Sequence, residues 1–256
     1  MSYNVEDRTR RFIMYKFGEK HPFILEIILT LLAFGLAITS YYVGQYLGYP
    51  PVFTFLLGMI AIGLLLMLLF IRAFIGEKPK RSFLVALPSL LFIVWNIYYN
   101  LDSGNKIGDT DWLIRAAITA IAVAVFEEVL YRGIFIYNLE RNDFNAFGCL
   151  VFSSMFYVLT QIPSFLGKDL LSTGLTVAYA LVLGLALSAV YQRNHRILQI
   201  VLIRFLIEFS SEIFAEKPSG YTQLQLIIFV SLLVVELLYA NIIALVGRKK
   251  EIISQV

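Results

Sequence analysis

Two adjacent carboxylates and an arginine, Glu127, Glu128 and Arg132, stand in the middle of an apolar segment. Ionisable groups are costly to bury in such a segment, so they usually pair with one another and face inward. Arg132 follows Glu128 by four residues, which favours an ion pair on one helix face. Glu127 points about 100° away around the helix. It is therefore available as a base or a ligand in a cavity, although the same residues would also serve as a buried ion pair that holds helices together.

A second set of charges lies in a later apolar segment. Arg204, Glu208 and Glu212 are spaced four residues apart and share one helix face. Charges inside an apolar helix must face protein or water. Arg204 is therefore a natural partner for Glu127 or Glu208. Gln161, near the end of a third apolar segment, is either a part of the same site or an ordinary polar residue at a helix end.

The remaining polar residues suggest little further chemistry. The only two histidines, His21 and His195, lie at the edges of apolar segments. A zinc site usually takes three protein ligands, often histidines, and the single cysteine allows neither an internal disulfide nor a cysteine-rich metal site. We therefore expect no metal and no cofactor. Glu26, Arg115 and Glu236 are near helix ends, where we expect their charged groups to reach the membrane surface.

The elements that position these residues are predicted to be membrane-spanning helices. The chain is 59% hydrophobic and 15% charged, with a mean hydropathy of +0.77. A soluble domain cannot bury so much apolar surface, and stretches of about 20 apolar residues are typical of membrane spans. The sequence therefore predicts an all-α membrane protein of about eight transmembrane helices, with a kink at Pro88 in the third. Their approximate ranges are 22–44, 51–72, 82–99, 112–137, 144–165, 170–192, 196–214 and 222–246.

The basic residues predict the orientation of the chain. Fifteen of the 21 Lys and Arg residues fall at the two termini and in the loops on their side, whereas three fall in the other loops. Lys and Arg gather on the cytoplasmic side of membrane proteins, so both termini are predicted to be cytoplasmic. Residues 1–21 would form an interfacial segment, 22–247 one multi-pass membrane domain and 248–256 a cytoplasmic tail. No basic run is long enough to form a nucleic-acid-binding face.

Three motifs, on the apolar segments 112–137, 144–165 and 196–214, resemble in type and order those of the CPBP family (CAAX protease and bacteriocin-processing, also called Abi). This family consists of eight-helix intramembrane glutamate proteases and their relatives. The first family motif, EExxxR, is intact from Glu127 to Arg132. The second, FxxxH, matches best with Tyr157 as the aromatic residue and Gln161 in place of histidine; the alternative register places Thr160 there. The third, HxxxN or HxxxD, has Arg204 and Glu208 at its two positions. The resemblance covers roughly residues 113–214.

The resemblance implies a glutamate protease fold in which the catalytic partners have changed. In active relatives a glutamate and a histidine activate water, while a histidine and an asparagine stabilise the oxyanion. A glutamine cannot shuttle protons in this way. The resemblance therefore implies an impaired or inactive member that acts in a bacterial cell membrane, in contact with lipids, as a scaffold or regulator for another membrane protein in envelope assembly or signalling. The family motif positions are Glu127, Glu128, Arg132, Gln161, Arg204 and Glu208.

Two other functions remain open from the sequence. An active endopeptidase would use Glu127 as its general base, with Gln161 and Arg204 in altered roles, because an arginine can in principle hold an oxyanion. A transporter or lipid-handling protein would use the intramembrane charges as a substrate path. The chain shows neither an inverted repeat nor paired Gly/Pro-broken helices, which are features that transporters often have.

Overall fold

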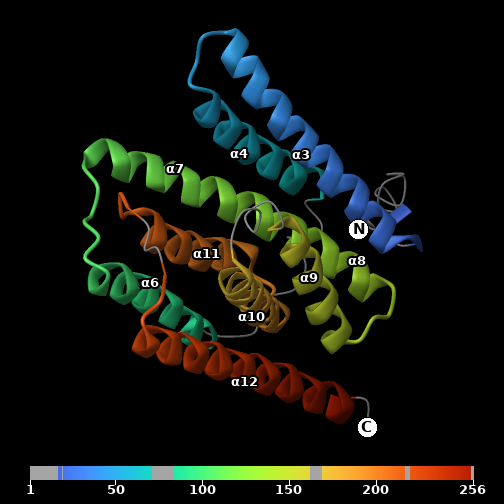
Figure 1. Ribbon diagram of the computed structural model, residues 1–256. Helices are drawn as coiled ribbons and strands as arrows, with labels where there is room; N and C mark the ends of the chain where they lie inside the picture. Colours follow the sequence, from blue (N-terminus) through green and yellow to red (C-terminus); the bar gives the residue numbers. More distant parts are fainter. Residues whose placement is uncertain (1–16, 19, 71–82, 162–168, 217–219, 255–256) are drawn as a thin grey trace.

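The computed structural model describes residues 17–254 apart from residue 19 and the segments 71–82, 162–168 and 217–219. The described residues form helices and no strand, with one isolated β-bridge between Ile107 and Phe214. Figure 1 shows most helices running in the same direction or its reverse, with the start of the helix at Pro22 and the end of the helix at Ser254 at one end of the bundle. The all-α fold class predicted from the sequence is confirmed.

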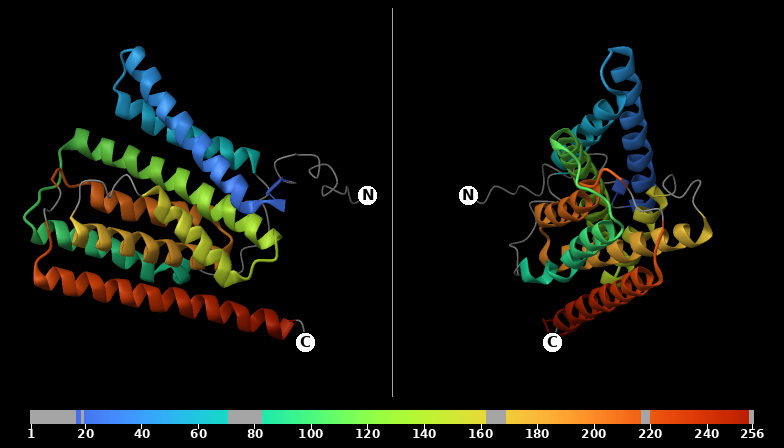
Figure 2. Two further views of the ribbon diagram at one scale, coloured as in Figure 1. Left: turned by 45° about the vertical axis from the view of Figure 1, so that its right-hand side comes forward. Right: turned by 60° about the vertical axis from the view of Figure 1, so that its left-hand side comes forward.

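The first two spans form a hairpin that projects from the rest of the bundle. They are α3 (Pro22–Tyr46) and α4 (Pro51–Leu69). Each begins with a proline, which the first turn of a helix tolerates because a backbone N–H at that position would have no partner within the helix. Between them, Gly48 has a φ of +76°, a left-handed conformation that glycine adopts without steric cost. Figure 2 shows the hairpin standing away from the other helices, with α4 lying against α7 (Thr110–Glu127).

The third span is broken at Pro88, as predicted. Two short 3₁₀ segments, η1 (Phe83–Ala86) and η2 (Pro88–Leu90), precede α6 (Leu91–Asp102). Proline lacks a backbone N–H and clashes with the carbonyl of the preceding turn. The regular α-helix therefore begins only after this residue.

The span that carries the Glu-Glu motif is one long helical segment that is interrupted by a π-helix. It consists of α7, the π-helix η3 (Glu128–Phe135) and α8 (Ile136–Arg141). Asp109 caps its start by accepting a hydrogen bond from the backbone N–H of Trp112 at 2.9 Å. The π-helical stretch, which the sequence did not predict, coincides with the motif residues after Glu127. Such wide turns often occur at functional sites.

Four more helices complete the bundle. Asn145 and Asp169 cap two of them through hydrogen bonds to backbone N–H groups, and His195 ends one with a left-handed φ of 48°. These helices are α9 (Ala146–Thr160), α10 (Leu170–Asn194), α11 (Ile197–Glu212) and α12 (Gln223–Ser254). The last helix therefore continues through most of the predicted tail 248–256, while residues 1–16 of the predicted interfacial segment lie outside the described residues.

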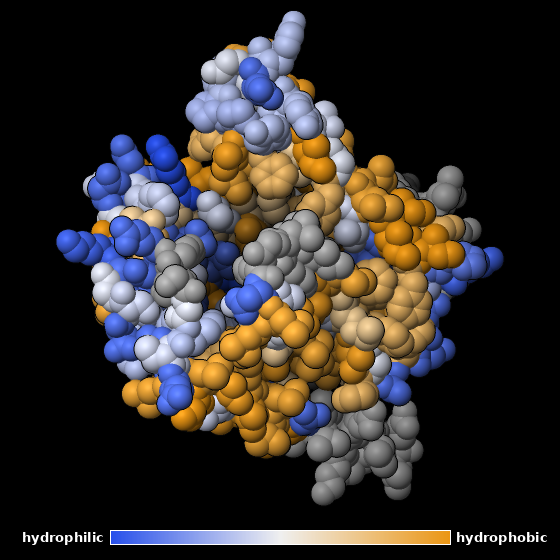
Figure 3. Space-filling model, in the orientation of Figure 1, coloured by the Kyte–Doolittle hydropathy of each residue, from blue (hydrophilic) through white to orange (hydrophobic). Residues whose placement is uncertain are grey.

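The surface is that of a membrane protein. Among the described residues, four helices are long and apolar enough to cross a bilayer, within 22–46, 51–69, 170–194 and 223–243. Large apolar side chains are exposed on them, such as Leu31, Leu68 and Leu238. In Figure 3 hydrophilic residues gather at the left, where α6 joins α7, and hydrophobic residues cover the middle of the molecule. This distribution suits a helix bundle with lipid around its centre and water at its ends.

Two of the carboxylates expected to reach the membrane surface do not. Glu26 and Glu236 are completely buried, and their carboxyl oxygens have no hydrogen-bond partner. The expectation that these two carboxylates reach the membrane surface was wrong, because it was based on their distance from the helix end. Their burial depends on which face of the helix they occupy. Glu26 shares the inward face of α3 with Leu25 and Leu29, and Glu236 shares that of α12 with Leu233. Arg115, by contrast, is exposed.

Candidate functional site

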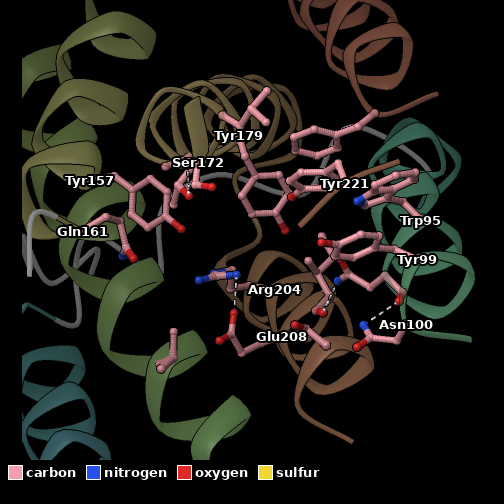
Figure 4. Close-up of a pocket in the computed structure, with 18 of the residues that line it drawn as sticks. Trp95, Tyr99, Asn100, Tyr157, Gln161, Ser172, Tyr179, Arg204, Glu208 and Tyr221 are labelled. Carbon is pink, nitrogen blue, oxygen red and sulfur yellow. Dashed lines mark hydrogen bonds and ion pairs between the residues drawn. The ribbon is translucent and has the colours of Figure 1, made fainter. Parts of the chain in front are cut away.

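A cavity of about 740 Å³ lies among α6, α7, α9, α10, α11 and the start of α12. Its inner part is lined by Glu127, Tyr157, Gln161, Arg204 and Glu208. Figure 4 shows Arg204 in the middle, with Tyr157 and Gln161 on one side and Trp95, Tyr99 and Tyr221 on the other. Family motif positions on three different helices therefore meet in one hollow.

Glu127 is held by hydrogen bonds at both of its carboxylate oxygens. Gln161 Nε2 donates to Oε1 at 2.8 Å, and Arg204 donates to Oε2 from Nη2 at 3.1 Å and from Nε at 3.3 Å. The Glu127 side chain is 10% exposed and the Arg204 side chain 5%. Charge-assisted hydrogen bonds of this kind, away from bulk water, are among the stronger ones in proteins. Glu127 is therefore fixed in place by the two residues that replace histidines in the family pattern.

Arg204 also contacts a second carboxylate. Its Nη1 lies 2.8 Å from Glu208 Oε2, one helical turn further along α11. The Glu208 side chain is 23% exposed and reaches the cavity, so it is the most accessible member of this network. Arg204 therefore joins Glu127 and Glu208 into the set of ion pairs expected from the sequence.

The pair Glu128–Arg132 lies behind the cavity wall and does not line it. Arg132 Nη1 is 3.3 Å from Glu128 Oε1, and neither side chain has any exposure. The two groups form an ion pair whose geometry does not make a hydrogen bond, while Arg132 Nη2 donates to the carbonyl of Gly184 at 3.5 Å. This pair connects η3 to α10, which is the structural role that the sequence left open.

Tyr157 links the two sets of charges. Its ring lies 4.7 Å from the guanidinium carbon of Arg132 and 5.7 Å from that of Arg204. Both distances are within the range in which a cation is attracted to an aromatic face. The side chain is 2% exposed. Three carboxylates, two guanidiniums and one aromatic ring thus form a single buried cluster with one carboxylate in excess.

The π-helix is connected to neighbouring helices by hydroxyl groups. Ser153 Oγ donates to the carbonyl oxygen of Tyr131 at 3.0 Å, and Ser188 Oγ donates to Ser153 Oγ at 3.3 Å. A wide turn leaves carbonyl groups less well satisfied than a regular helix does. These serines on α9 and α10 therefore help to hold the segment that orients Glu128 and Arg132.

The outer part of the cavity has an aromatic wall that the sequence interpretation missed. The rings of Trp95, Tyr99, Tyr221 and Phe229 lie within 24° of parallel, and the centroids of their stacked pairs are 4.7 to 6.4 Å apart. They come from α6, from the residues before α12, and from α12 itself. The run of aromatic residues and amides from Trp95 to Asn100 was the available signal.

Asp169 and Ser172 lie at the mouth of the cavity. Asp169 accepts hydrogen bonds from the Ser172 hydroxyl at 2.6 Å and from its backbone N–H at 3.0 Å. These bonds stabilise the carboxylate, so they lower the pKa of Asp169 below that of an ordinary aspartate. Burial has the opposite effect on Tyr221, whose pKa is raised because its ring packs in the aromatic wall.

The structure separates the other candidate residues from the cavity. His21 precedes α3 and His195 follows α10, and neither lines the cavity. The side chain of Thr160, the alternative to Gln161, is outside the described part of the chain. Within that part, no group of three His, Cys, Asp or Glu side chains is placed to hold a metal ion.

Comparison with known proteins found one similar family. The model of the type II CAAX prenyl endopeptidase Rce1-like family matches residues 109–210. This match supports the resemblance to the CPBP family over this segment. The segment runs from the cap of α7 to near the end of α11 and contains all the motif positions discussed above, whereas the α3–α4 hairpin, α6 and α12 lie outside it. Searches among curated proteins and among solved structures found no match.

Proposed function

We propose that this CPBP family member binds another membrane protein without cleaving it, as a scaffold or regulator in the cell membrane with both termini cytoplasmic. The observation that carries the proposal is the environment of Glu127. Water activation needs a carboxylate or imidazole that can take up a proton and pass it on. The groups on Glu127 are an amide and a guanidinium, and neither changes its protonation state near neutral pH, so neither can serve as a general acid or base. Both histidines of the chain are elsewhere.

The cavity itself supports a binding role. A hollow of about 740 Å³ is within the usual size of ligand sites, and its combination of aromatic walls with a few placed polar groups is typical of such sites. An ion pair inside it joins α7 to α11, and the hydrogen bond from Gln161 at the end of α9 joins that helix to them. A rigid, charged and aromatic hollow suits recognition of a side chain or short segment of a partner.

Purification from the native membrane tests the proposal. We expect one partner protein in near-stoichiometric amount in mild detergent, intact by mass spectrometry. Its recovery per chain should be equal in wild type, in Glu127→Gln, and in the control Asp111→Asn, which changes an exposed carboxylate on the same helix. Expression of each variant is compared first, so that loss of protein is not confused with loss of binding.

The second candidate function is endoproteolysis with Glu127 as general base. It is favoured by the open space beside Glu127 and by the donors of Arg204, which could stabilise an oxyanion. In that case a substrate protein would co-purify in intact form only with the Glu127→Gln variant, and the same protein would be found shortened in cells with the wild-type chain. That result would overturn the binding proposal.

A further inference from the structure

The cavity opens toward one end of the bundle. Its outer lining comes from Asn100 at the end of α6, from Asp169 and Ser172 at the start of α10, and from Gly220 and Tyr221 just before α12. Figure 2 shows the connections from α6 to α7 and from α11 to α12 at the end of the bundle opposite to the start of α3 and the end of α12. The mouth therefore lies on the side of the membrane opposite to the start of α3 and the end of α12.

The distribution of basic residues places this mouth outside the cytoplasm. The connections on the mouth side contain Lys106, Lys168 and Lys217, whereas fifteen Lys and Arg residues belong to the termini and to the connections on their side. An excess of this size over short loops orients helical membrane proteins with the basic side in the cytoplasm. An occupant of the cavity would then arrive from the extracytoplasmic side.

The charges of the cavity favour a cation. Its described lining contains three carboxylates, Glu127, Glu208 and Asp169, and one guanidinium, Arg204. Arg204 already contacts two of these carboxylates at 3.1 Å and 2.8 Å, so it is poorly placed to attract an anion. A cleft with an excess of charge of one sign concentrates ions of the opposite sign.

The aromatic wall suits the same type of ligand. Trp95, Tyr99 and Tyr221 line the outer half of the cavity opposite Glu208. The faces of such rings attract Lys, Arg and quaternary ammonium groups. A carboxylate on one side and aromatic rings on the other together form a site in which a cationic group is held by both.

We infer that the cavity receives a cationic side chain of the partner from the extracytoplasmic side. This inference rests on the proposed binding function and adds to it the chemical class of the contact and the side from which it comes. The contact atoms on this chain are the Glu208 carboxylate, the Asp169 carboxylate at the mouth and the rings of the aromatic wall.

Charged thiol reagents in intact cells test both parts. The only native cysteine, Cys149, is completely buried, so a new cysteine gives a clean signal. Thr176→Cys places a thiol in the cavity wall, Thr110→Cys gives an exposed thiol on the same side, and Arg196→Cys gives one on the opposite side. Each is treated with a trimethylammonium-ethyl and a sulfonato-ethyl methanethiosulfonate, neither of which crosses membranes.

We expect Thr176→Cys and Thr110→Cys to react in intact cells and Arg196→Cys to react only in opened cells. The ratio of cationic to anionic reaction rates should be about tenfold higher at Thr176→Cys than at Thr110→Cys, the lower end of electrostatic steering in clefts. Glu208→Gln should lower that ratio several-fold. Asp169→Asn should lower it as well, and this variant leaves the Arg204 ion pairs intact.

Reaction of Thr176→Cys only in opened cells, or equal rate ratios at the two sites, would overturn the inference. Neither depends on whether a partner co-purifies, so failure here is distinct from failure of the binding proposal. Partner recovery with Asp169→Asn and Glu208→Gln identifies the source of the cation. Loss of the partner assigns the cation to the partner, whereas full recovery with a lost rate preference points to a free organic cation and contradicts the inference.

Discussion

Replacement of Arg204 by methionine should destabilise the protein strongly. Methionine keeps much of the side-chain volume but leaves Glu127 with only Gln161 as a partner. Removing one member of a buried ion pair costs about 3–5 kcal/mol. The pair with Glu127 meets that description, since the two side chains are 5% and 10% exposed. The pair with Glu208, which is 23% exposed, should contribute about 1 kcal/mol or less.

The assay is thermal unfolding of purified protein in detergent, followed by tryptophan fluorescence. We expect Arg204→Met to lower the midpoint by on the order of 10 °C. The uncharged variant Glu127→Gln/Arg204→Met/Glu208→Gln should recover most of this loss, because replacing all charges of a buried network is far less costly than removing one partner. A double-mutant cycle should give a larger coupling of Arg204 to Glu127 than to Glu208.

The reasoning fails if Arg204→Met unfolds within about 2 °C of wild type, on the scale expected for a surface pair. It also fails if the uncharged variant is no more stable than Arg204→Met. The first result would mean that water reaches the cluster and replaces the guanidinium. The second would mean that the residues act through shape and not through charge.

Two further predictions concern the helices around the site. Gly184→Ala should destabilise the folded protein by about 1–3 kcal/mol, because the added Cβ would lie 3.1 Å from the Cβ and 3.2 Å from the Cα of Ser154 on α9. The control Gly174→Ala has open space around its added Cβ and should stabilise α10 by up to about 1 kcal/mol. Thermal unfolding measures both effects. The pKa of Asp169 is lowered in the folded protein. The hydrogen bonds by which the ionised Asp169 caps α10 therefore contribute their full stability above the pKa that Asp169 has in the unfolded chain. This stability is lost as the pH falls below roughly 4 and the carboxylate takes up a proton. Unfolding midpoints of wild type should therefore fall more steeply in acid than those of Asp169→Asn, and parallel curves would contradict the prediction.

The helices were predictable because hydropathy and proline act locally. A run of apolar residues predicts a span wherever it occurs, and Pro88 breaks the third span through its own ring and missing N–H. The spacing of Glu128 and Arg132 likewise determines that they can pair. The residues that meet in the cavity were found through three motifs, each placed on its own helix by such local rules.

The features that were not predicted depend on contacts between distant segments. The π-helix from Glu128 to Phe135 is stabilised in part by Ser153 on another helix, which no local pattern reveals. The aromatic wall brings Trp95 of α6 beside Tyr221 and Phe229. Glu26 was placed wrongly because its exposure depends on which face of α3 packs against the bundle.

An arginine at position 204, where the sequence resemblance expects a histidine, sets different requirements on the residues around it. A histidine can be neutral, so a site built on it tolerates a single carboxylate and can pass protons. An arginine is always charged, and in this buried position it is accompanied by Glu127, Glu208 and the ring of Tyr157. Glu208, one helical turn after Arg204, reaches its guanidinium at 2.8 Å. In the proposed function, the arginine stands where the family pattern has a proton-transfer group, and Glu208 presents a carboxylate to the cavity; the proposed lack of catalysis and the proposed preference for a cation then have one physical origin.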